Sequence, residues 1–154
     1  MVAADAPFNV LVTGIGGTGV ITVGALLGMA AHLEGKGCSV LDVTGLAQKN
    51  GPVTSHVRVA AKADDIHASR IASGGADLVI GCDIVVAANP ENLAKLSPER
   101  STPVVNSHVA PTSDFAADPD LDLSSAGMEE AIGAGSRPGE ASFVDGTGLA
   151  TALL

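Results

Sequence analysis

Short apolar runs alternate with glycine-rich or polar turns along this chain. The first run, at 8–12, leads into the segment TGIGGTGV at 13–20, and a longer apolar run follows at 20–33. A strand that is apolar without interruption is typical of a parallel sheet covered on both faces. The pattern therefore predicts a strand, a glycine loop and a helix as the first unit of an α/β fold.

The remaining apolar runs predict further strands and helices. Strands are expected at 38–42, 54–60, 76–83, 102–106 and 141–145, and helices at 19–34, 84–88, 90–96, 124–134 and 147–154. This order predicts a Rossmann-like α/β fold, in which a mainly parallel sheet carries helices on both faces. We expect a single domain over 1–154, truncated at the C-terminus because no helix-ending signal follows the last helix.

The strand expected at 54–60 differs from the others because polar and apolar residues alternate along it. Val57 and Val59 share one face, and His56 and Arg58 share the other. Such alternation predicts a half-exposed strand at a sheet edge or in antiparallel pairing. We interpret His56 as a solvated side chain, and we interpret His108 in the same way.

The first helix is apolar on almost every side. Small residues, Gly24, Gly28 and Ala31, recur on it at helical spacing, and Ile21 and Met29 lie on the side that would face solvent. A helix that is apolar all round is expected to be buried all round. Either another domain or subunit covers its outer face, or the small residues only let the helix lie close to its own sheet.

Composition and charge exclude several classes of protein. Of the 154 residues 46% are hydrophobic and 16% charged, which is not the composition of a disordered chain. The net charge of −9 argues against nucleic-acid binding, since phosphate contacts need Lys and Arg. Residues 1–62 carry four basic and three acidic residues, whereas the remainder carries four and fourteen, so the half with the glycine loop tolerates an anion better. We interpret the cluster of Asp residues at 114–122 as an acidic surface loop.

The two cysteines, Cys38 and Cys82, lie far apart in the sequence. A four-thiolate zinc or iron–sulfur site needs more ligands than these, so we expect no metal site and interpret both as inert core thiols. With no secretory leader and no convincing membrane span, we expect a cytoplasmic protein without membrane contact. The sequence contains no recognised catalytic motif, and we assign no catalytic residue.

The glycine loop is the strongest candidate for a binding site. A loop between a strand and a helix can turn backbone N–H groups toward an anion, usually a phosphate. Gly14, Gly16, Gly17, Thr18 and Gly19 would form this loop, and glycine lets the backbone approach a ligand closely. The alternative is that these glycines only allow a sharp turn, with nothing bound.

A NAD- or FAD-binding Rossmann domain would use the same loop. In that fold, an acidic residue at the end of the second strand binds a ribose hydroxyl, and Asp42 occupies such a position. A dinucleotide-binding domain does not need the polar segment Gln48-Lys49-Asn50 that follows, nor the alternating strand after it. We therefore keep this interpretation as the alternative.

Several stretches together are more specific than the loop alone. GIGGTGV at 14–20 is followed by DVTGLAQKNGPV at 42–53 and SHVR at 55–58, with NSHV at 106–109 and VDGTGLA at 144–150. They resemble the gamma domain of 2-oxoacid:ferredoxin oxidoreductases, which include the pyruvate and ketoisovalerate enzymes. The resemblance is closest to the indolepyruvate branch and covers nearly the whole chain.

The resemblance implies a part of an enzyme that converts a 2-oxoacid and CoA to acyl-CoA and CO2, with electrons passing to ferredoxin. Thiamine diphosphate and iron–sulfur clusters would act on other domains, so this chain would bind no cofactor firmly and would be inactive alone. It would pack against the thiamine-diphosphate domains and help close over the CoA. The five loop residues would face the CoA phosphates or maintain the loop, with Gln48, Lys49 and Asn50 at the same sheet edge.

One departure from the family pattern concerns the polar segment. Many relatives outside the indolepyruvate branch carry Arg-Gly-Gly where this chain has Lys49-Asn50-Gly51. An ammonium cannot reproduce the bidentate fork of a guanidinium, so the resemblance does not by itself assign an anion contact to Lys49. A purely structural subunit that binds no small molecule remains a third interpretation.

Overall fold

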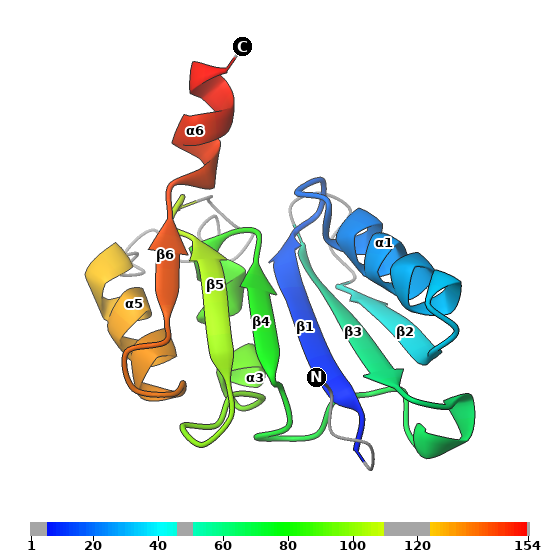
Figure 1. Cartoon of the computed structure of the whole chain (residues 1–154). Coiled ribbons are helices and arrows are strands. Elements are labelled where there is room, and N and C mark those ends of the chain that lie inside the picture. Colours follow the sequence, from blue (N-terminus) through cyan, green and yellow to red (C-terminus); the bar gives the residue numbers. More distant parts are fainter. Residues whose placement is uncertain (1–5, 46–50, 110–123, 154) are drawn as a thin grey trace.

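A computed structural model describes residues 6–45, 51–109 and 124–153, and it has the layered α/β architecture expected from the sequence (Figure 1). The strands are β1 (Phe8–Ile15), β2 (Gly37–Thr44), β3 (Pro52–Ala60), β4 (Leu78–Gly81), β5 (Thr102–Asn106) and β6 (Ser142–Val144). The helices are α1 (Val20–Leu33), α2 (Ile84–Ala87), α3 (Pro90–Leu93), α5 (Ser125–Ala134) and α6 (Gly146–Ala152), with a short 3-10 turn at Ala63–Asp65. The predicted Rossmann-like α/β class is confirmed.

The six strands form one mixed sheet in the order β2-β3-β1-β4-β5-β6. Strands β1, β4, β5 and β6 run parallel, whereas β3 is antiparallel to both of its neighbours, β1 and β2. The predicted antiparallel pairing of 54–60 is therefore confirmed. This strand lies inside the sheet, however, and β2 forms the edge.

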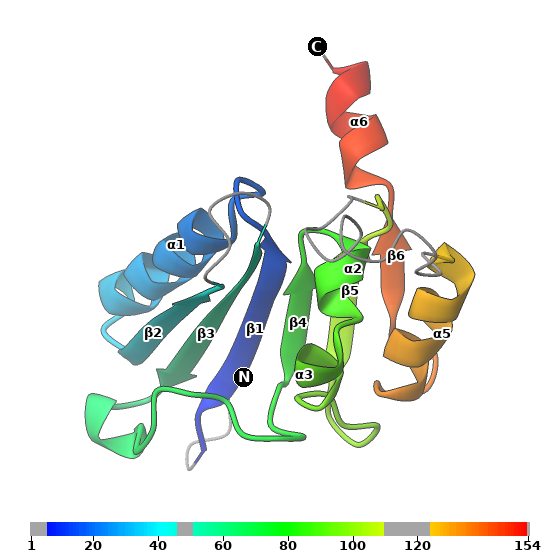
Figure 2. The same ribbon diagram turned by 180° about the vertical axis from the view of Figure 1, so that it is seen from behind.

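Helices cover the two faces of the sheet at different strands (Figures 1 and 2). Helix α1 packs on β1, β2 and β3, and its core contains Val10, Val12, Val20, Val53 and Val57. On the opposite face, α2 and α5 pack together over a second core that includes Leu11, Val79, Ile84, Val105 and Ile132. Because β1 contributes alternate residues to both cores, it is the central strand of the fold.

Helix α1 lies very close to its own sheet. A Cβ on Gly24 would collide with the Ser55 side chain on β3, and one on Gly28 would lie 2.8 Å from a methyl group of Val40 on β2. The small residues therefore serve the contact with the sheet, as one of the two interpretations expected. The opposite side of the helix stays uncovered, with Leu26 65% and Met29 57% exposed.

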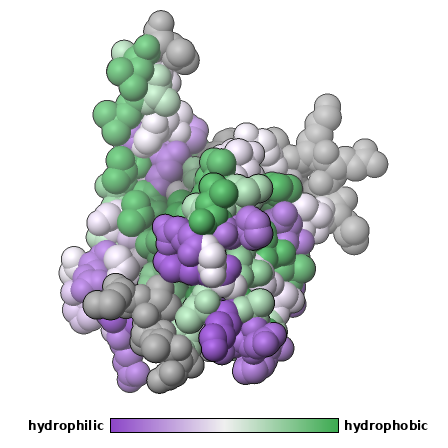
Figure 3. All heavy atoms as spheres, turned by 45° about the vertical axis from the view of Figure 1, so that its right-hand side comes forward, coloured by the Kyte–Doolittle hydropathy of each residue, from purple (hydrophilic) through white to green (hydrophobic). Residues whose placement is uncertain are grey.

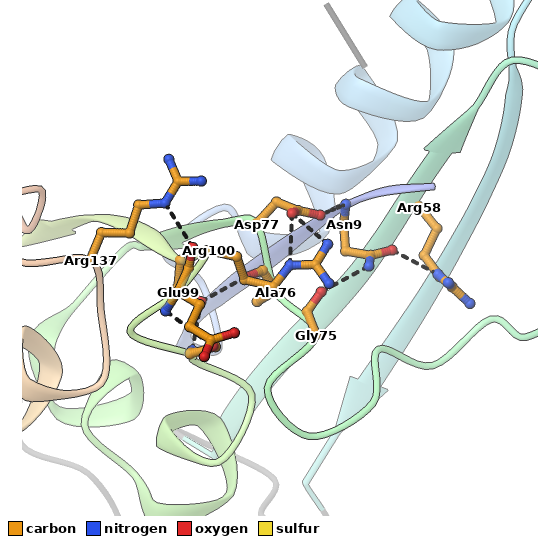
Figure 4. A network of polar contacts seen from close by, with 10 residues as sticks. Asn9, Arg58, Gly75, Ala76, Asp77, Glu99, Arg100 and Arg137 are labelled. Atoms are coloured by element: carbon orange, nitrogen blue, oxygen red, sulfur yellow. Dashed lines mark hydrogen bonds and ion pairs between the residues drawn. The ribbon is translucent and has the colours of Figure 1, made fainter. Parts of the chain in front are cut away.

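A network of charged and polar groups ties the amino-terminal ends of the parallel strands together (Figure 4). Asp77 accepts a hydrogen bond from the backbone N–H of Asn9 at 2.8 Å, and Arg100 donates to the same carboxylate at 2.6 and 2.9 Å. The Asn9 side chain donates to the carbonyl of Gly75 and accepts from Arg58, both at 2.8 Å. These bonds join β1, β3, β4 and the turn before β5 at the end of the strands that is opposite the glycine loop.

His56 is buried, and the expectation of a solvated side chain is wrong. His56 is 4% exposed, and its Nδ1 accepts a hydrogen bond from the backbone N–H of Ile71 at 3.2 Å. The residues after β3 fold back over this face of the strand, which the alternating pattern of 54–60 could not indicate. Burial, together with the positive charges of Arg70 and Lys95, lowers the pKa of His56 to about 4.

The lowered pKa of His56 predicts a loss of stability in mild acid. In the unfolded chain this imidazole protonates near pH 6.5, whereas in the folded chain it stays neutral down to about pH 4. The free energy of unfolding should therefore fall as the pH drops from 7 to 4.5, with about 2–3 kcal/mol of the fall due to His56. Urea unfolding followed by far-ultraviolet circular dichroism at both pH values measures this.

The matched variants are His56→Gln, which keeps an acceptor for Ile71, and His32→Gln on the exposed side of α1. Between pH 7 and 4.5, the free energy of unfolding should fall by about 2–3 kcal/mol less in His56→Gln than in the wild type. In His32→Gln it should fall as much as in the wild type. Equal losses in the wild type and in His56→Gln would contradict the assignment.

Candidate functional site

The candidate binding residues lie together at the carboxyl ends of the parallel strands. The glycine loop follows β1, Asp83 follows β4, Asn106 ends β5 and Asp145 follows β6. Open α/β sheets bind ligands at this end of their strands. The polar network of Figure 4 lies at the other end of the same strands, so it serves stability and not this site.

Hydrogen bonds within the chain fix the shape of the glycine loop. The Thr18 hydroxyl donates to the Ile15 carbonyl at 2.7 Å, and the Gly16 N–H donates to the Gly51 carbonyl at 3.0 Å. Gly17 and Gly19 adopt positive φ angles of 96° and 89°, which L side chains rarely adopt. The loop is therefore held in one conformation, and glycine is required at both positions.

Asp83 links the loop to the neighbouring strand, a role that the sequence analysis missed. It is 1% exposed, and its carboxylate accepts the N–H of Ile15 at 2.9 Å and the N–H of Val86 at 2.9 Å. Burial raises the pKa of this carboxyl, while the backbone donors and the charge of His108 oppose the shift. Residue 83 falls at the end of the strand predicted at 76–83, although an Asp before an apolar run is also a helix N-cap signal.

A cleft of about 250 Å³ opens beside the loop. Its walls are formed by Ile15, Gly16, Gly17, Gly19, Val20, Ile21, Thr22 and Val53. Within the described chain, the N–H groups of Gly17, Gly19 and Val20 donate to no protein acceptor, and they lie at the positive end of α1. The cleft therefore offers backbone donors to an anion, without a charged side chain among these lining residues.

The predicted loop residues take different parts in this geometry. Gly14 lies inside β1 beneath the loop, where an added Cβ would be 2.8 Å from a Val20 methyl and 2.9 Å from the Cys82 Cβ. The N–H group of Thr18 donates to the Ile15 carbonyl and that of Gly16 to the Gly51 carbonyl, so both are already used within the chain. Gln48, Lys49 and Asn50 lie outside the described residues.

Asp42 does not reach the position that a dinucleotide-binding domain requires. It pairs with Ser55 on β3, and Ser55 pairs in turn with Val12 on β1. Since β3 lies between, Asp42 is two strand spacings, about 10 Å, from β1. This arrangement disfavours the NAD- or FAD-binding alternative, in which the acidic residue ends the strand next to β1.

The cysteines are less buried than expected. Cys38 and Cys82 are free and half-buried, and burial raises the pKa of each thiol, which disfavours the reactive thiolate. The described residues contain no group of three or more His, Cys, Asp or Glu side chains that could hold a metal ion. Of the helices in the same part of the chain, none is long and apolar enough to cross a membrane.

Two substitutions separate the structural glycine from the one that borders the cleft. Gly14→Ala should lower the free energy of unfolding by about 1–3 kcal/mol, because the methyl group has no space. Gly16→Ala should change it by less than about 0.5 kcal/mol, because the nearest atom to its Cβ would be 3.9 Å away. Urea unfolding measures both, with circular dichroism as the signal because the chain has no Trp or Tyr. Equal destabilisation by the two changes would contradict this description of the loop.

Comparison with known proteins finds relatives that are indolepyruvate oxidoreductase subunits. The chain is 34% identical over 88 residues to the indolepyruvate oxidoreductase subunit IorB of Pyrococcus horikoshii, covering 57% of this chain and 42% of that protein. The subunit of the same name from Methanothermobacter thermautotrophicus is 32% identical over 104 residues, covering 68% and 50%. The chain thus spans about half the length of the curated relatives it matches.

A solved structure supports the fold. The pyruvate oxidoreductase subunit PORC of Thermotoga maritima superposes with a TM-score of 0.62 at 18% identity, covering 96% of this chain and 66% of that chain. The family model described as pyruvate ferredoxin/flavodoxin oxidoreductase matches residues 9–151, nearly the whole chain. The chain therefore belongs to the pyruvate ferredoxin/flavodoxin oxidoreductase family.

Proposed function

We propose that this chain is the gamma component of an indolepyruvate-type 2-oxoacid:ferredoxin oxidoreductase. The complete enzyme would convert a 2-oxoacid and CoA to acyl-CoA and CO2 and pass the electrons to ferredoxin. The family match over residues 9–151 carries this proposal, and the relatives named as indolepyruvate oxidoreductase subunits support the branch. We place the complex in the cytoplasm.

The chemistry would take place on partner domains. Iron–sulfur clusters need several cysteine ligands, and this chain has only Cys38 and Cys82. In the complete enzyme, thiamine diphosphate supplies the decarboxylation chemistry and the clusters carry the electrons. The residues of this chain would bind, position and enclose, and the isolated chain would be inactive.

The outer face of α1 is the surface that would contact the thiamine-diphosphate domains. Ile21, Leu26, Met29 and Leu33 are 48%, 65%, 57% and 79% exposed, so one helix presents four large apolar side chains to solvent. Figure 3 turns the α1 side of the molecule forward, and hydrophobic atoms are visible at the surface there. Large exposed apolar patches typically mark protein–protein contacts.

The cleft beside the glycine loop would receive a phosphate group of CoA. The N–H groups of Gly17, Gly19 and Val20, which have no acceptor among the described residues, and the dipole of the 14-residue helix α1 favour an anion there. Gly16 borders the cleft and leaves space for the ligand. The proposed contact with CoA includes Gln48, Lys49 and Asn50, which come between β2 and β3 in the sequence.

Assembly tests the role of α1. The chain is produced together with a thiamine-diphosphate-binding subunit from the same organism, and co-elution in size-exclusion chromatography is measured. Leu26→Glu should weaken the complex at least tenfold, because it places a charge in an apolar contact. Ala126→Glu introduces the same charge at an exposed position of α5, on the opposite face of the sheet, and should not. Normal assembly of Leu26→Glu would overturn the proposed docking face.

Steady-state kinetics of the assembled enzyme tests the cleft. Gly16→Val should raise the KM for CoA at least tenfold and leave the KM for indolepyruvate unchanged, because only the phosphate cleft is filled. Gly133→Ala in α5, where an added Cβ would meet no atom within 4 Å, serves as the control glycine variant. An unchanged KM for CoA in a correctly assembled Gly16→Val enzyme would favour the interpretation in which the loop is only structural.

A further inference from the structure

A second cavity lies on the face of the sheet opposite α1, and the proposed function does not use it. It has a volume of about 350 Å³ and is lined by Val43, Thr54, His56, Arg70, Glu91, Asn92, Ala94 and Lys95. We call it the His56 groove. A smaller pocket of about 120 Å³ adjoins it and shares Val43, Thr54, Glu91 and Asn92 with it. The combined space is in the range of small-molecule sites.

The floor of the His56 groove presents a hydrogen-bond donor. His56 is neutral near pH 7, and its Nδ1 is the acceptor for the Ile71 N–H at 3.2 Å. In a neutral imidazole the other nitrogen then carries the proton, so Nε2–H is the free donor. No protein acceptor for Nε2–H exists in the described chain, and Nε2 is not among its fully enclosed, unbonded polar atoms. The Nε2–H group is therefore available to a ligand in the groove.

The walls of the groove add two cations. Arg70 and Lys95 both line it, and neither forms an ion pair with any acidic side chain in the described parts of the chain. Glu91 is the single acidic residue of the lining, so the lining carries a net charge of +1 in a protein whose net charge is −9. Both cations are close enough to His56 to disfavour its protonation. A local concentration of unpaired positive charge attracts anions.

The remaining lining completes a site for a molecule larger than an ion. Val43 and Ala94 provide apolar surface, and Thr54 provides a hydroxyl group. Asn92 is 6% exposed and is held in place by its Nδ2–H bond to the Val86 carbonyl at 2.8 Å. An apolar wall with a few fixed polar groups is typical of pockets for small organic molecules.

We propose that the His56 groove binds a small organic anion, whose carboxylate or phosphate accepts hydrogen bonds from His56 Nε2, Arg70 and Lys95. The groove lies on the α3 side of β3, whereas the glycine-loop cleft lies at the first turn of α1, the helix that packs on the other face. The anion would therefore occupy a site separate from the proposed CoA contact. The proposal does not depend on the proposed function.

Nuclear magnetic resonance of the histidine imidazoles in the full chain tests the proposal. Inorganic phosphate and pyruvate are titrated separately at constant ionic strength, at pH 6.5. At least one probe should shift the His56 signals in a saturable way, and it should raise the pKa of His56 because an anion stabilises the imidazolium. The exposed His32 on α1 serves as an internal control and should not shift. Saturation by phosphate alone or by pyruvate alone identifies the anionic group.

Charge-removing variants identify the site. Arg70→Gln and Lys95→Gln should each weaken binding of the probe at least fivefold. Lys62→Gln removes one exposed positive charge elsewhere and should change it by less than twofold. The proposal is overturned if neither probe shifts the His56 signals, or if Lys62→Gln weakens binding as much as Lys95→Gln does.

Discussion

The close contact between α1 and the β2–β3 pair is the constraint on which the rest of the structure depends. Gly24 and Gly28 remove the Cβ atoms that would otherwise separate the helix from Ser55 and Val40. The helix can therefore cover three strands, although it is the only helix on its face of the sheet in the described chain. Small residues of the helix are used for this contact, and large apolar residues such as Leu26 and Met29 are exposed on the outer side.

The amino-terminal ends of the parallel strands carry contacts that stabilise the fold, whereas their carboxyl ends carry the candidate binding site. At the amino-terminal end, the Asp77 carboxylate is shared by a backbone N–H and the Arg100 guanidinium, and the strands are fixed to one another. At the carboxyl end, a single buried carboxylate, that of Asp83, joins β4 to the glycine loop. At this second end a rigid scaffold positions the loop, and the N–H groups of Gly17, Gly19 and Val20 find no acceptor in the part of the chain that the structure describes.

Much of the fold follows from local sequence signals. The uninterrupted apolar strand, the glycine loop and Asn89-Pro90 at the start of α3 all act through neighbouring residues, and the structure confirms the elements they predict. The Asn89 side chain accepts the N–H of Glu91 as a helix cap does. Such signals depend on spacing and residue type alone, which a single sequence contains.

The errors concern contacts between residues far apart in the sequence. His56 looks solvated from the alternation of 54–60, but Ile71, fifteen residues later, covers it. The position of β3 between β1 and β2, which removes Asp42 from the ribose position, is equally invisible in local pattern. Arg70 and Lys95 come together with His56 only because two separate connections cross the same face of β3. The candidate glycine site could therefore be located from sequence, whereas the His56 groove could not.

Helix α6 stands apart from the rest of the molecule, with no buried residue (Figure 1). Among the described residues, side-chain hydrogen bonds hold its first turn, from Asp145 as the cap at Gly148 and from Asn106 at Gly146 and Thr147. A helix of seven residues is only marginally stable without tertiary contacts. Local opening of α6 therefore costs little free energy, so its amide protons exchange with solvent almost as fast as those of a free peptide. The amide protons of β1, in contrast, exchange only when the whole domain unfolds.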